Sequence, residues 1–341
     1  MRKNLIPADG CFYKANLHSH TNLSDGELSP LELKQLYKSR GYSVLAITDH
    51  DIFIPHHDLT EDDFLLLSGF EMAFNENGTF PGNRYLKCCH ICLLARSPEM
   101  REQPFWHPRY AYVGNAKMHH DQVCPDPATN MYVRNYDPEE ISRVMETCRE
   151  AGFFVTYNHP TWSMEDYRQY GSYHGMHAME IFNYDCERIG YPSYVPNIYD
   201  DILRTGKKIY PVAADDSHCR KPENDPGFDA GGGFVMIKAK ELNYRAVMDA
   251  LFAGDFYASS GPEIYELYVE DDRIHIKTSP CAHIEMTFGT RGSHIAHAKP
   301  GETVDCAEFP LDRQCGYFRL TLRDGQGNFA NTRAYFMEDL P

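Results

Sequence analysis

The chain has 341 residues, 42% of them hydrophobic, and a formal net charge of −16 at pH 7. This length and apolar content suffice for one large domain and a smaller one, and they exclude a largely disordered chain. The acidic balance argues against a nucleic-acid-binding protein, because phosphate backbones are bound through basic faces.

Short apolar runs alternate with helical patterns from the N-terminus to about residue 260. Such runs, bounded by turn residues, are typical of strands that are buried on both faces. We expect strands at residues 42–50, 64–71, 88–95, 152–160, 178–183, 208–218 and 232–239.

The helices between these strands have recognisable ends. Ser29-Pro30-Leu31-Glu32 is a capping box with proline at the first helical position, and Gly41 ends that helix. Asp137 begins a second helix, which runs to Gly152, and further helices are expected over residues 197–205 and 244–253. Repeated alternation of strand and helix predicts an α/β domain with a parallel sheet, either open or closed into a barrel.

The pattern changes at about Pro262. Residues 263–341 alternate apolar and polar positions, with Asp324-Gly325 as a hairpin turn, which predicts a small all-β, sandwich-like domain. We therefore divide the chain into domains 1–262 and 263–341. We expect the second domain to buttress the first or to form a dimer contact, with carbohydrate binding as the alternative. Residues 96–136 show no clear period, and we interpret them as a lid or substrate-shaping insertion.

The eleven cysteines favour a reducing compartment, because their number is odd and their spacing is scattered. Cys89 and Cys92 form a C-x-x-C pair without a second pair at zinc-finger spacing, so we expect neither a structural nor a redox role for it. No apolar run approaches the roughly 18 residues of a membrane span, and the N-terminus does not resemble a secretory leader. We expect a soluble, cytoplasmic protein.

Side chains that can bind metal occur where the strands of the first domain end. His18 and His20 are two residues apart, so in an extended strand both imidazoles point to one side. An isolated His-x-His also occurs on ordinary surface strands. Here, however, the other strands end in or carry further ligand-capable residues, namely Asp25, His50, Glu71, His90, His159, Asp216 and His218. Strand ends converge in barrels, and apolar strands disfavour charges that are neither paired nor metal-bound, so we expect a metal site.

These residues resemble the ordered motifs of the PHP (polymerase and histidinol phosphatase) family. The matching segments are His18-x-His20, Thr48-Asp49-His50, Glu71 after Ser68-Gly69-Phe70, His159-Pro160 and Asp216-Ser217-His218. The resemblance covers about residues 14–262. Asp25 and the segment 259–267 are most similar to stand-alone PHP metal-dependent phosphoesterases and to the related carbaryl-esterase-like metallohydrolases. The resemblance implies a distorted (β/α)7 PHP-type barrel that holds two or three divalent metal ions.

The resemblance also implies how the ligands are shared. One ion would be held by His18, His20, Glu71 and Asp216. Glu71 would bridge to a second ion, which would also be held by His90 and His159. A third ion would be held by Asp25, His50 and His218, where many family members have a histidine in place of Asp25. Nitrogen and oxygen ligands without thiolate accept zinc, manganese or iron, and a carboxylate at position 25 favours manganese or iron.

Such ions would bind a bridging water and lower its pKa, which supplies hydroxide at neutral pH. They would also neutralise the oxygens of a phosphate ester and of its leaving group. Asp216, His218 or a metal-bound water could protonate the leaving alkoxide. We therefore take Glu71, Asp216 and His218 as candidate catalytic residues and small phosphate mono- or diesters as the expected substrates.

Other functions remain open. A carboxylic-ester or carbamate hydrolase could use the same metals. A nucleic-acid proofreading module is opposed by the acidic charge and by the lack of attached polymerase sequence. A non-catalytic binding domain is opposed by the complete ligand set. The sequence leaves the oligomeric state undecided, and a homo-oligomer is possible.

Residues for substrate binding are less sharply defined. Cations near predicted loop ends could contact phosphate or simply be solvated: Arg84, Arg96, Lys117, Arg134, Arg188 and Arg220. Asp49 could orient His50 or cap a helix. Tyr157, Asn158 and Asn183 could line the pocket, and His119-His120 could enter it from the insertion. Surface or packing roles are expected for His56-His57 and for the C-terminal histidines.

Overall fold

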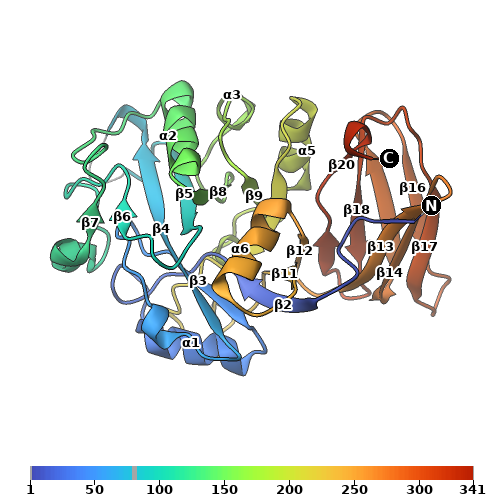
Figure 1. Cartoon of the computed structure of the whole chain (residues 1–341), viewed down its shortest axis with the longest axis horizontal. Helices are drawn as coiled ribbons and strands as arrows, with labels where there is room; N and C mark the ends of the chain where they lie inside the picture. The colour runs from blue at the N-terminus through green and yellow to red at the C-terminus, as the bar shows by residue number, and fades with distance from the viewer. Residues whose placement is uncertain (1, 79–82, 341) are drawn as a thin grey trace.

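The computed structural model describes residues 2–78 and 83–340. Strands outnumber helices in these residues. Most of the strands belong to one mixed sheet that runs from the first part of the chain into the second (Figure 1). In spatial order its strands are β10 (Tyr210–Ala214), β9 (Ala178–Asn183), β8 (Phe153–Tyr157), β5 (Cys88–Ala95), β4 (Leu65–Asn75), β3 (Val44–Ile47), β2 (Cys11–Asn16), β11 (Phe234–Ala239), β12 (Phe256–Ser259), β19 (Phe329–Asn331), β18 (Tyr317–Arg323), β15 (His283–Phe288) and β16 (Ser293–His297), with β20 (Tyr335–Phe336) paired to β18.

The helices begin and end at the expected signals. The capping box of Ser29 and Glu32 is formed, and Asp137 accepts hydrogen bonds from the backbone of Glu139 and Glu140. Gly254 ends the last long helix in the left-handed conformation that glycine adopts without strain. The α-helices are α1 (Pro30–Ser39), α2 (Pro138–Glu150), α3 (Tyr167–Tyr170), α4 (Tyr184–Arg188), α5 (Pro196–Arg204) and α6 (Tyr244–Ala253). The four helices expected from the sequence are thus confirmed, as α1, α2, α5 and α6.

The sheet is mixed, and the expectation of a parallel sheet is wrong in this respect. β2, β3 and β4 are parallel, as are β8, β9 and β10, but β5 is antiparallel to both of its neighbours. The reason lies in the link from β4 to β5, where the described residues contain only the short 3-10 helix Glu76–Gly78. A parallel return needs a longer crossover, usually with a helix. Residues 2–78 and 83–340 therefore do not form seven regular strand–helix units.

The segments that follow β2 and β10 lie side by side. Ser19 and Ser217 form a parallel bridge, the backbone N–H of His20 donates to the carbonyl of Ser217 (2.9 Å), and that of Asp216 donates to His18 (3.0 Å). The segment after β10, the strand at one end of the sheet, thus contacts the segment after β2, a strand in the middle of the sheet. This contact brings the polar residues after β2 and β10 to the same place.

The strands of the first part are buried on both faces. In β3, Val44 and Ala46 belong to one core cluster, whereas Leu45 and Ile47 belong to another. Successive side chains of a strand point to opposite faces, so both faces of β3 are covered. Each fully buried aliphatic side chain contributes roughly 1.5–3 kcal/mol, which makes this framework a firm support for the polar residues at its strand ends.

The insertion is attached to the strand framework by a buried arginine. Arg134 donates to the carbonyl of Ala73 (2.9 Å) and pairs with Asp51 (2.5 Å), next to His50. Both side chains of this ion pair are almost fully buried. The insertion otherwise consists of turns, the 3-10 helix Ala116–Gln122 and the short pair of β6 (Glu102–Gln103) with β7 (Cys124–Pro125).

The C-terminal part is rich in strands. A second sheet consists of β1 (Lys3–Asn4), β13 (Ile264–Glu270), β14 (Arg273–Cys281) and β17 (Val304–Pro310), and it shares a core cluster with β15 and β18. The chain's first residues therefore lie beside its last strands, where both termini appear in Figure 1. Arg319 of β18 donates two hydrogen bonds to Asp200 of α5 (2.7 and 2.8 Å), which links the two parts.

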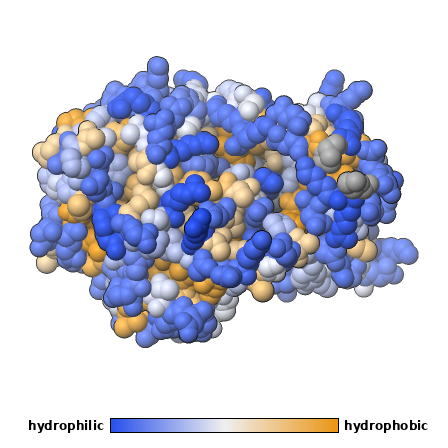
Figure 2. Space-filling view, in the orientation of Figure 1, coloured by the Kyte–Doolittle hydropathy of each residue, from blue (hydrophilic) through white to orange (hydrophobic). Residues whose placement is uncertain are grey.

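Hydrophilic residues cover most of the face seen in Figure 2, and hydrophobic residues form smaller patches between them. Among the described residues, none of the helices combines the length and the apolar character needed to cross a membrane. All eleven cysteines are free.

Candidate metal centre

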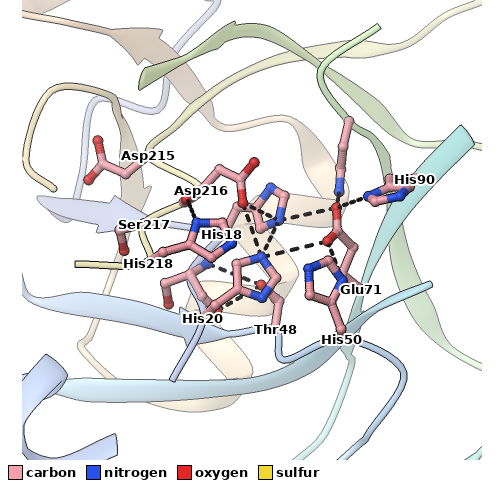
Figure 3. A network of polar contacts seen from close by, with 12 residues as sticks. His18, His20, Thr48, His50, Glu71, His90, Asp215, Asp216, Ser217 and His218 are labelled. Atoms are coloured by element: carbon pink, nitrogen blue, oxygen red, sulfur yellow. Dashed lines mark hydrogen bonds and ion pairs between the residues drawn. The ribbon is translucent and has the colours of Figure 1, made fainter. Parts of the chain in front are cut away.

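The ligand-capable residues lie together at one side of the strand framework. His18 and His20 follow β2, His50 follows β3, His159 follows β8, and Asp216 and His218 follow β10, while β4 and β5 carry Glu71 and His90. All of these side chains are buried, and only Asp25, in the loop after β2, is partly exposed. In Figure 3, Glu71, His50 and His90 approach from one side, and Asp216 and His218 from the other.

The Glu71 carboxylate lies between imidazoles on both sides. Its Oε1 is 3.2 Å from Nδ1 of His90 and 3.2 Å from Nε2 of His159. Its Oε2 is 3.0 Å from Nδ1 of His50 and 3.6 Å from Nε2 of His20. The two oxygens therefore face different groups of histidines, as a bridging carboxylate requires.

Asp216 lies beside the first two histidines. Its Oδ1 is 3.1 Å from Nε2 of His18 and 3.0 Å from Nε2 of His20, and these two ring nitrogens are 3.1 Å apart. Asp216 itself has a φ of 55°, in the left-handed region, and His159 has a φ of 23°. Positive φ values at residues other than glycine are strained and cluster at functional sites.

Asp25 forms the outer end of the cluster. Its carboxylate is 3.6 Å from Nε2 of His50, 3.5 Å from Nε2 of His218 and 3.9 Å from Nδ1 of His20. The His20 ring stacks between those of His50 and His218, at centroid distances of 4.3 and 4.5 Å. These four side chains converge on one point.

The cluster divides into overlapping groups whose ligand atoms lie within 4.8 Å of one another. The groups are His20, Asp25, His50 and His218; His18, His159 and Asp216; His50, Glu71 and His90; His18, Glu71 and Cys92; and Asp185, His218 and Asp229. This division keeps Asp25, His50 and His218 together, as the resemblance implies. It separates His159 from His90, which the resemblance placed on one ion, although both contact Glu71. The assignment of ligands to individual ions stays a prediction.

The chemistry of the cluster fits metal ions. Four of its buried atoms make no hydrogen bond of proper geometry: Nδ1 of His20, His50 and His90, and Oδ1 of Asp25. For His50 and His90 this holds although each Nδ1 lies within 3.2 Å of Glu71. A buried polar atom without a partner costs roughly 1–3 kcal/mol, and such atoms in native proteins need an explanation. Imidazole and carboxylate together are the ligands that zinc, manganese and iron accept. The residues can therefore hold divalent cations.

The charges of the cluster shift the pKa values of its own members. Burial alone would raise the pKa of Glu71, but the surrounding imidazoles, led by His18, hold that pKa well below its usual value. Burial would lower the pKa of His18, but Asp216 and other neighbours outweigh it and raise the pKa well above its usual value. Burial and the neighbouring His50 instead lower the pKa of His20 to about 4. Ions that bind here would displace protons from the raised histidines.

An outer ring of acids and amides holds the cluster in place. Glu180 in β9 is fully buried, and its oxygens lie 2.7 Å from Nδ1 of His18 and 2.9 Å from the backbone N–H of His159. Asp49 accepts from the backbone of Thr21 (2.8 Å), so it supports the loop that carries Asp25 and does not cap a helix. Such partners fix the tautomer and direction of a metal-binding imidazole.

Asn158, Asp229 and Cys92 complete this surrounding shell. Asn158 donates to Oε1 of Glu71 (2.7 Å), and Asp229 accepts from the backbone N–H of His218 (2.8 Å). Cys92 lies opposite Glu71 on the neighbouring strand, and burial raises the pKa of its thiol to about 11. The contacts of Glu180, Asp229 and Cys92 with the cluster are not evident from the sequence. An acid inside the apolar strand 178–183 is the one signal that could have indicated Glu180.

A pocket of about 460 Å³ opens onto the cluster. Arg84 and Arg220 line it, and Arg220 also pairs with Asp25 (2.5 Å). Tyr112 and Val113 reach the pocket from the insertion, which agrees with a substrate-shaping role for that segment. The other expected cations, Arg96, Lys117, Arg134 and Arg188, are not among the described lining residues.

Several other residues expected near the pocket are engaged elsewhere. Nε2 of His120 lies 2.7 Å from the carbonyl of Ala111, and Nδ1 of His119 lies 2.8 Å from the amide of Gln122. Tyr157 donates to the buried Glu165 (2.5 Å). Asn183 reaches the cluster directly, because its amide donates to Oδ2 of Asp216 (3.2 Å).

No protein-family model matches the sequence, and no curated protein matches it significantly. Several solved structures are similar to the chain, and three of them are compared with it in turn. A two-domain protein from Bacteroides vulgatus ATCC 8482, containing a predicted PHP-like metal-dependent phosphoesterase, is 14% identical with a TM-score of 0.45, over 98% of this chain and 99% of that one. A protein from Bifidobacterium adolescentis ATCC 15703, provisionally assigned as a metal-dependent phosphoesterase, is 16% identical with a TM-score of 0.38, over 64% of this chain and 91% of that one.

The third structure is an amidohydrolase from Chromobacterium violaceum, solved with bound sulfate and no metal. It is 15% identical with a TM-score of 0.33, over 60% of this chain and 87% of that one. At these identities and TM-scores the similarity carries no information about substrate. None of the three is a carbaryl esterase, so the placement near that branch stays a prediction. The chain is similar to PHP-like metal-dependent phosphoesterases, as its motifs indicate.

Proposed function

We propose that the protein is a metal-dependent hydrolase of small phosphate esters. The observation that supports this most strongly is the position of Glu71, a buried carboxylate whose two oxygens face different sets of imidazoles. When bound, two or three divalent ions, zinc, manganese or iron, would activate water and neutralise the charge on the ester and its leaving group.

The protein's own residues would hold and orient these ions. Glu71 and Asp216 would supply the carboxylates, and Asp25 would supply the outer one. Glu180 would keep the proton of His18 on Nδ1, which leaves Nε2 free to bind metal. Asp216 and His218 both line the pocket, so either could pass a proton to the leaving alkoxide. Arg84 and Arg220 would bind the phosphate oxygens that face away from the ions.

The direct test is a panel of chromogenic esters with protein loaded separately with manganese, iron and zinc. p-Nitrophenyl phosphate and bis(p-nitrophenyl) phosphate represent mono- and diesters, and p-nitrophenyl acetate represents carboxylic esters. We expect metal-dependent release of nitrophenol from at least one phosphate and its loss in Glu71→Gln. Turnover of the acetate alone would favour a carboxylic-ester or carbamate hydrolase. Silence toward all the esters would favour a binding domain without catalysis.

We also infer the fold type, the domain division, the location and the partners of the protein. The bridge between Ser19 and Ser217 supports a distorted PHP-type barrel built on the seven strands from β2 to β10 that surround the site. The division at residue 262 is supported by a separate core cluster in the C-terminal part. The free cysteines support a cytoplasmic location. The expected partner is a small-molecule phosphate ester, without nucleic acid or membrane, and self-association is best examined by light scattering.

A further inference from the structure

One wall of the pocket is apolar and open to solvent. Trp162 and Met164 follow β8, and Ile189 and Tyr191 follow α4. All four line the pocket, and each is between 37% and 50% exposed. Most large apolar side chains of the described residues are buried, so this group is unusual, and exposed apolar groups that gather beside a polar site mark ligand contacts.

The two loops that form this wall are tied to each other and to the core. Thr161 donates through its hydroxyl to the carbonyl of Pro192 (2.7 Å), which joins the loop of Trp162 to that of Tyr191. Glu165, at the end of the first loop, is buried and accepts hydrogen bonds from Tyr136 (2.7 Å) and Tyr157 (2.5 Å). The wall is therefore held in place before any ligand arrives.

Trp162 links the wall to the candidate metal centre. The centroid of its ring lies 5.2 Å from that of His90 and 5.1 Å from that of His159, both in edge-to-face geometry. We take the leaving oxygen of an ester that reacts at this centre to lie near His159, whose Nε2 is 3.8 Å from Oδ2 of Asp216, one of the candidate proton donors. A group bonded directly to that oxygen would then rest against the indole.

The rest of the pocket is more polar than this wall. The lining imidazoles and most of the lining carboxylates belong to the candidate metal centre, and Arg220 lies beside the Asp25 carboxylate (2.5 Å). The volume of about 460 Å³ falls in the usual range of small-molecule sites, roughly 300–1,000 Å³, and has room for a ring in addition to a phosphate. Indole faces favour stacked or edge-to-face aromatic partners over small aliphatic ones.

We propose that the alcohol part of the substrate is aromatic, an aryl or arylmethyl group that binds on the wall formed by Trp162, Met164, Ile189 and Tyr191. This inference rests on the proposed function, because it takes the ester's reacting oxygen to lie at the metal centre. It adds a substrate class, phosphate esters of aromatic alcohols, and it assigns Trp162 as the main specificity residue.

The test compares two phosphonates that cannot be hydrolysed. The chain has two tryptophans, so Trp106→Phe leaves Trp162 as the only indole. In the metal-loaded protein, phenylphosphonate should bind about tenfold more tightly than methylphosphonate and should change the emission of Trp162, because burial of a ring face plus an aromatic contact has about this value. Calorimetric titration of Trp162→Ala should give a ratio close to one, and Trp162→Phe should restore most of the difference.

A matched control is Tyr265→Ala, because Tyr265 is exposed on β13, outside the residues that line the pocket. This variant should keep the wild-type ratio. Equal binding of the two phosphonates by the wild type, or an unchanged ratio in Trp162→Ala, would overturn the inference.

Hydrolysis of phenyl phosphate and methyl phosphate separates the two proposals. Turnover of both esters without a preference that depends on Trp162 would overturn only the aromatic subsite. A tenfold preference in phosphonate binding without turnover of any phosphate ester would overturn the proposed function and leave the subsite standing.

Discussion

Replacing Glu71 by glutamine would remove one negative charge from the middle of the histidine cluster without changing the size of the side chain. Glu71 is 1% exposed, so water cannot take over its role. Its Oε1 lies 3.2 Å from Nε2 of His159, and its Oε2 lies 3.0 Å from Nδ1 of His50. The change should therefore weaken ions on both sides of the carboxylate.

The expected loss of metal affinity can be estimated by comparison with residues that do not touch the metal. Side chains that only orient a metal ligand typically cost 10- to 100-fold in affinity when they are changed. A carboxylate that touches the ions should cost at least about 100-fold for each ion that it contacts, or about 2.7 kcal/mol per ion. If the wild type holds two or three ions, Glu71→Gln should retain about two fewer.

The assay is the metal content of dialysed protein, measured by inductively coupled plasma mass spectrometry. Glu165→Gln is the matched control, since Glu165 is also a buried glutamate but is hydrogen-bonded to tyrosines and not to the histidines. The control should keep the wild-type content, and circular dichroism should show both variants folded. A folded Glu71→Gln that loses one ion or none would refute the bridging role.

Three further changes test other parts of the cluster. Asp25→Ala should remove one ion and spare the rest, because Asp25 contacts only the outer end of the cluster; an unchanged metal content would exclude Asp25 as a ligand. Glu180→Gln should weaken metal binding about 10- to 100-fold, because it disturbs the contact that orients His18; competition with a chromophoric chelator measures this, and unchanged affinity would show that the contact is dispensable. Metal affinity should also rise with pH. Burial lowers the pKa of His218, but Asp25 and Asp216 outweigh burial and raise that pKa to about 9. An ion that binds His218 below that pH must displace a proton. Calorimetry in buffers of different ionisation enthalpy would count the protons released, and equal affinities at about pH 6 and pH 8 would contradict the expectation.

Local features of the fold could be predicted, but strand direction could not. The helix caps at Ser29 and Asp137 depend on only a few consecutive residues, and both caps are formed in the structure. β5 is buried on both faces, and such a run has the same composition whether its neighbours are parallel or antiparallel. The pairing of β1 with β13 joins residues more than 260 positions apart, a contact that no local pattern contains.

For the site, the sequence indicated which side chains would lie together, because each follows or occupies a strand. The surrounding shell was harder to predict. Arg134 looks like a surface cation in the sequence, but it is buried against Asp51, because the insertion folds back onto the framework. In the sequence Cys92 is one half of a C-x-x-C pair, whereas its contact with Asn158 (3.2 Å) depends on the pairing of β5 with its neighbours.

The central claim is that these histidines and acids jointly bind divalent metal ions. A crystal structure of the protein as purified, with anomalous data collected at the manganese, iron and zinc edges, tests it most directly. We predict two or three anomalous peaks within bonding distance of His18, Glu71, Asp216 and their neighbours, with one peak on each side of Glu71. A well-ordered cluster without a peak at any edge, even after soaking in all three metals, would contradict the account.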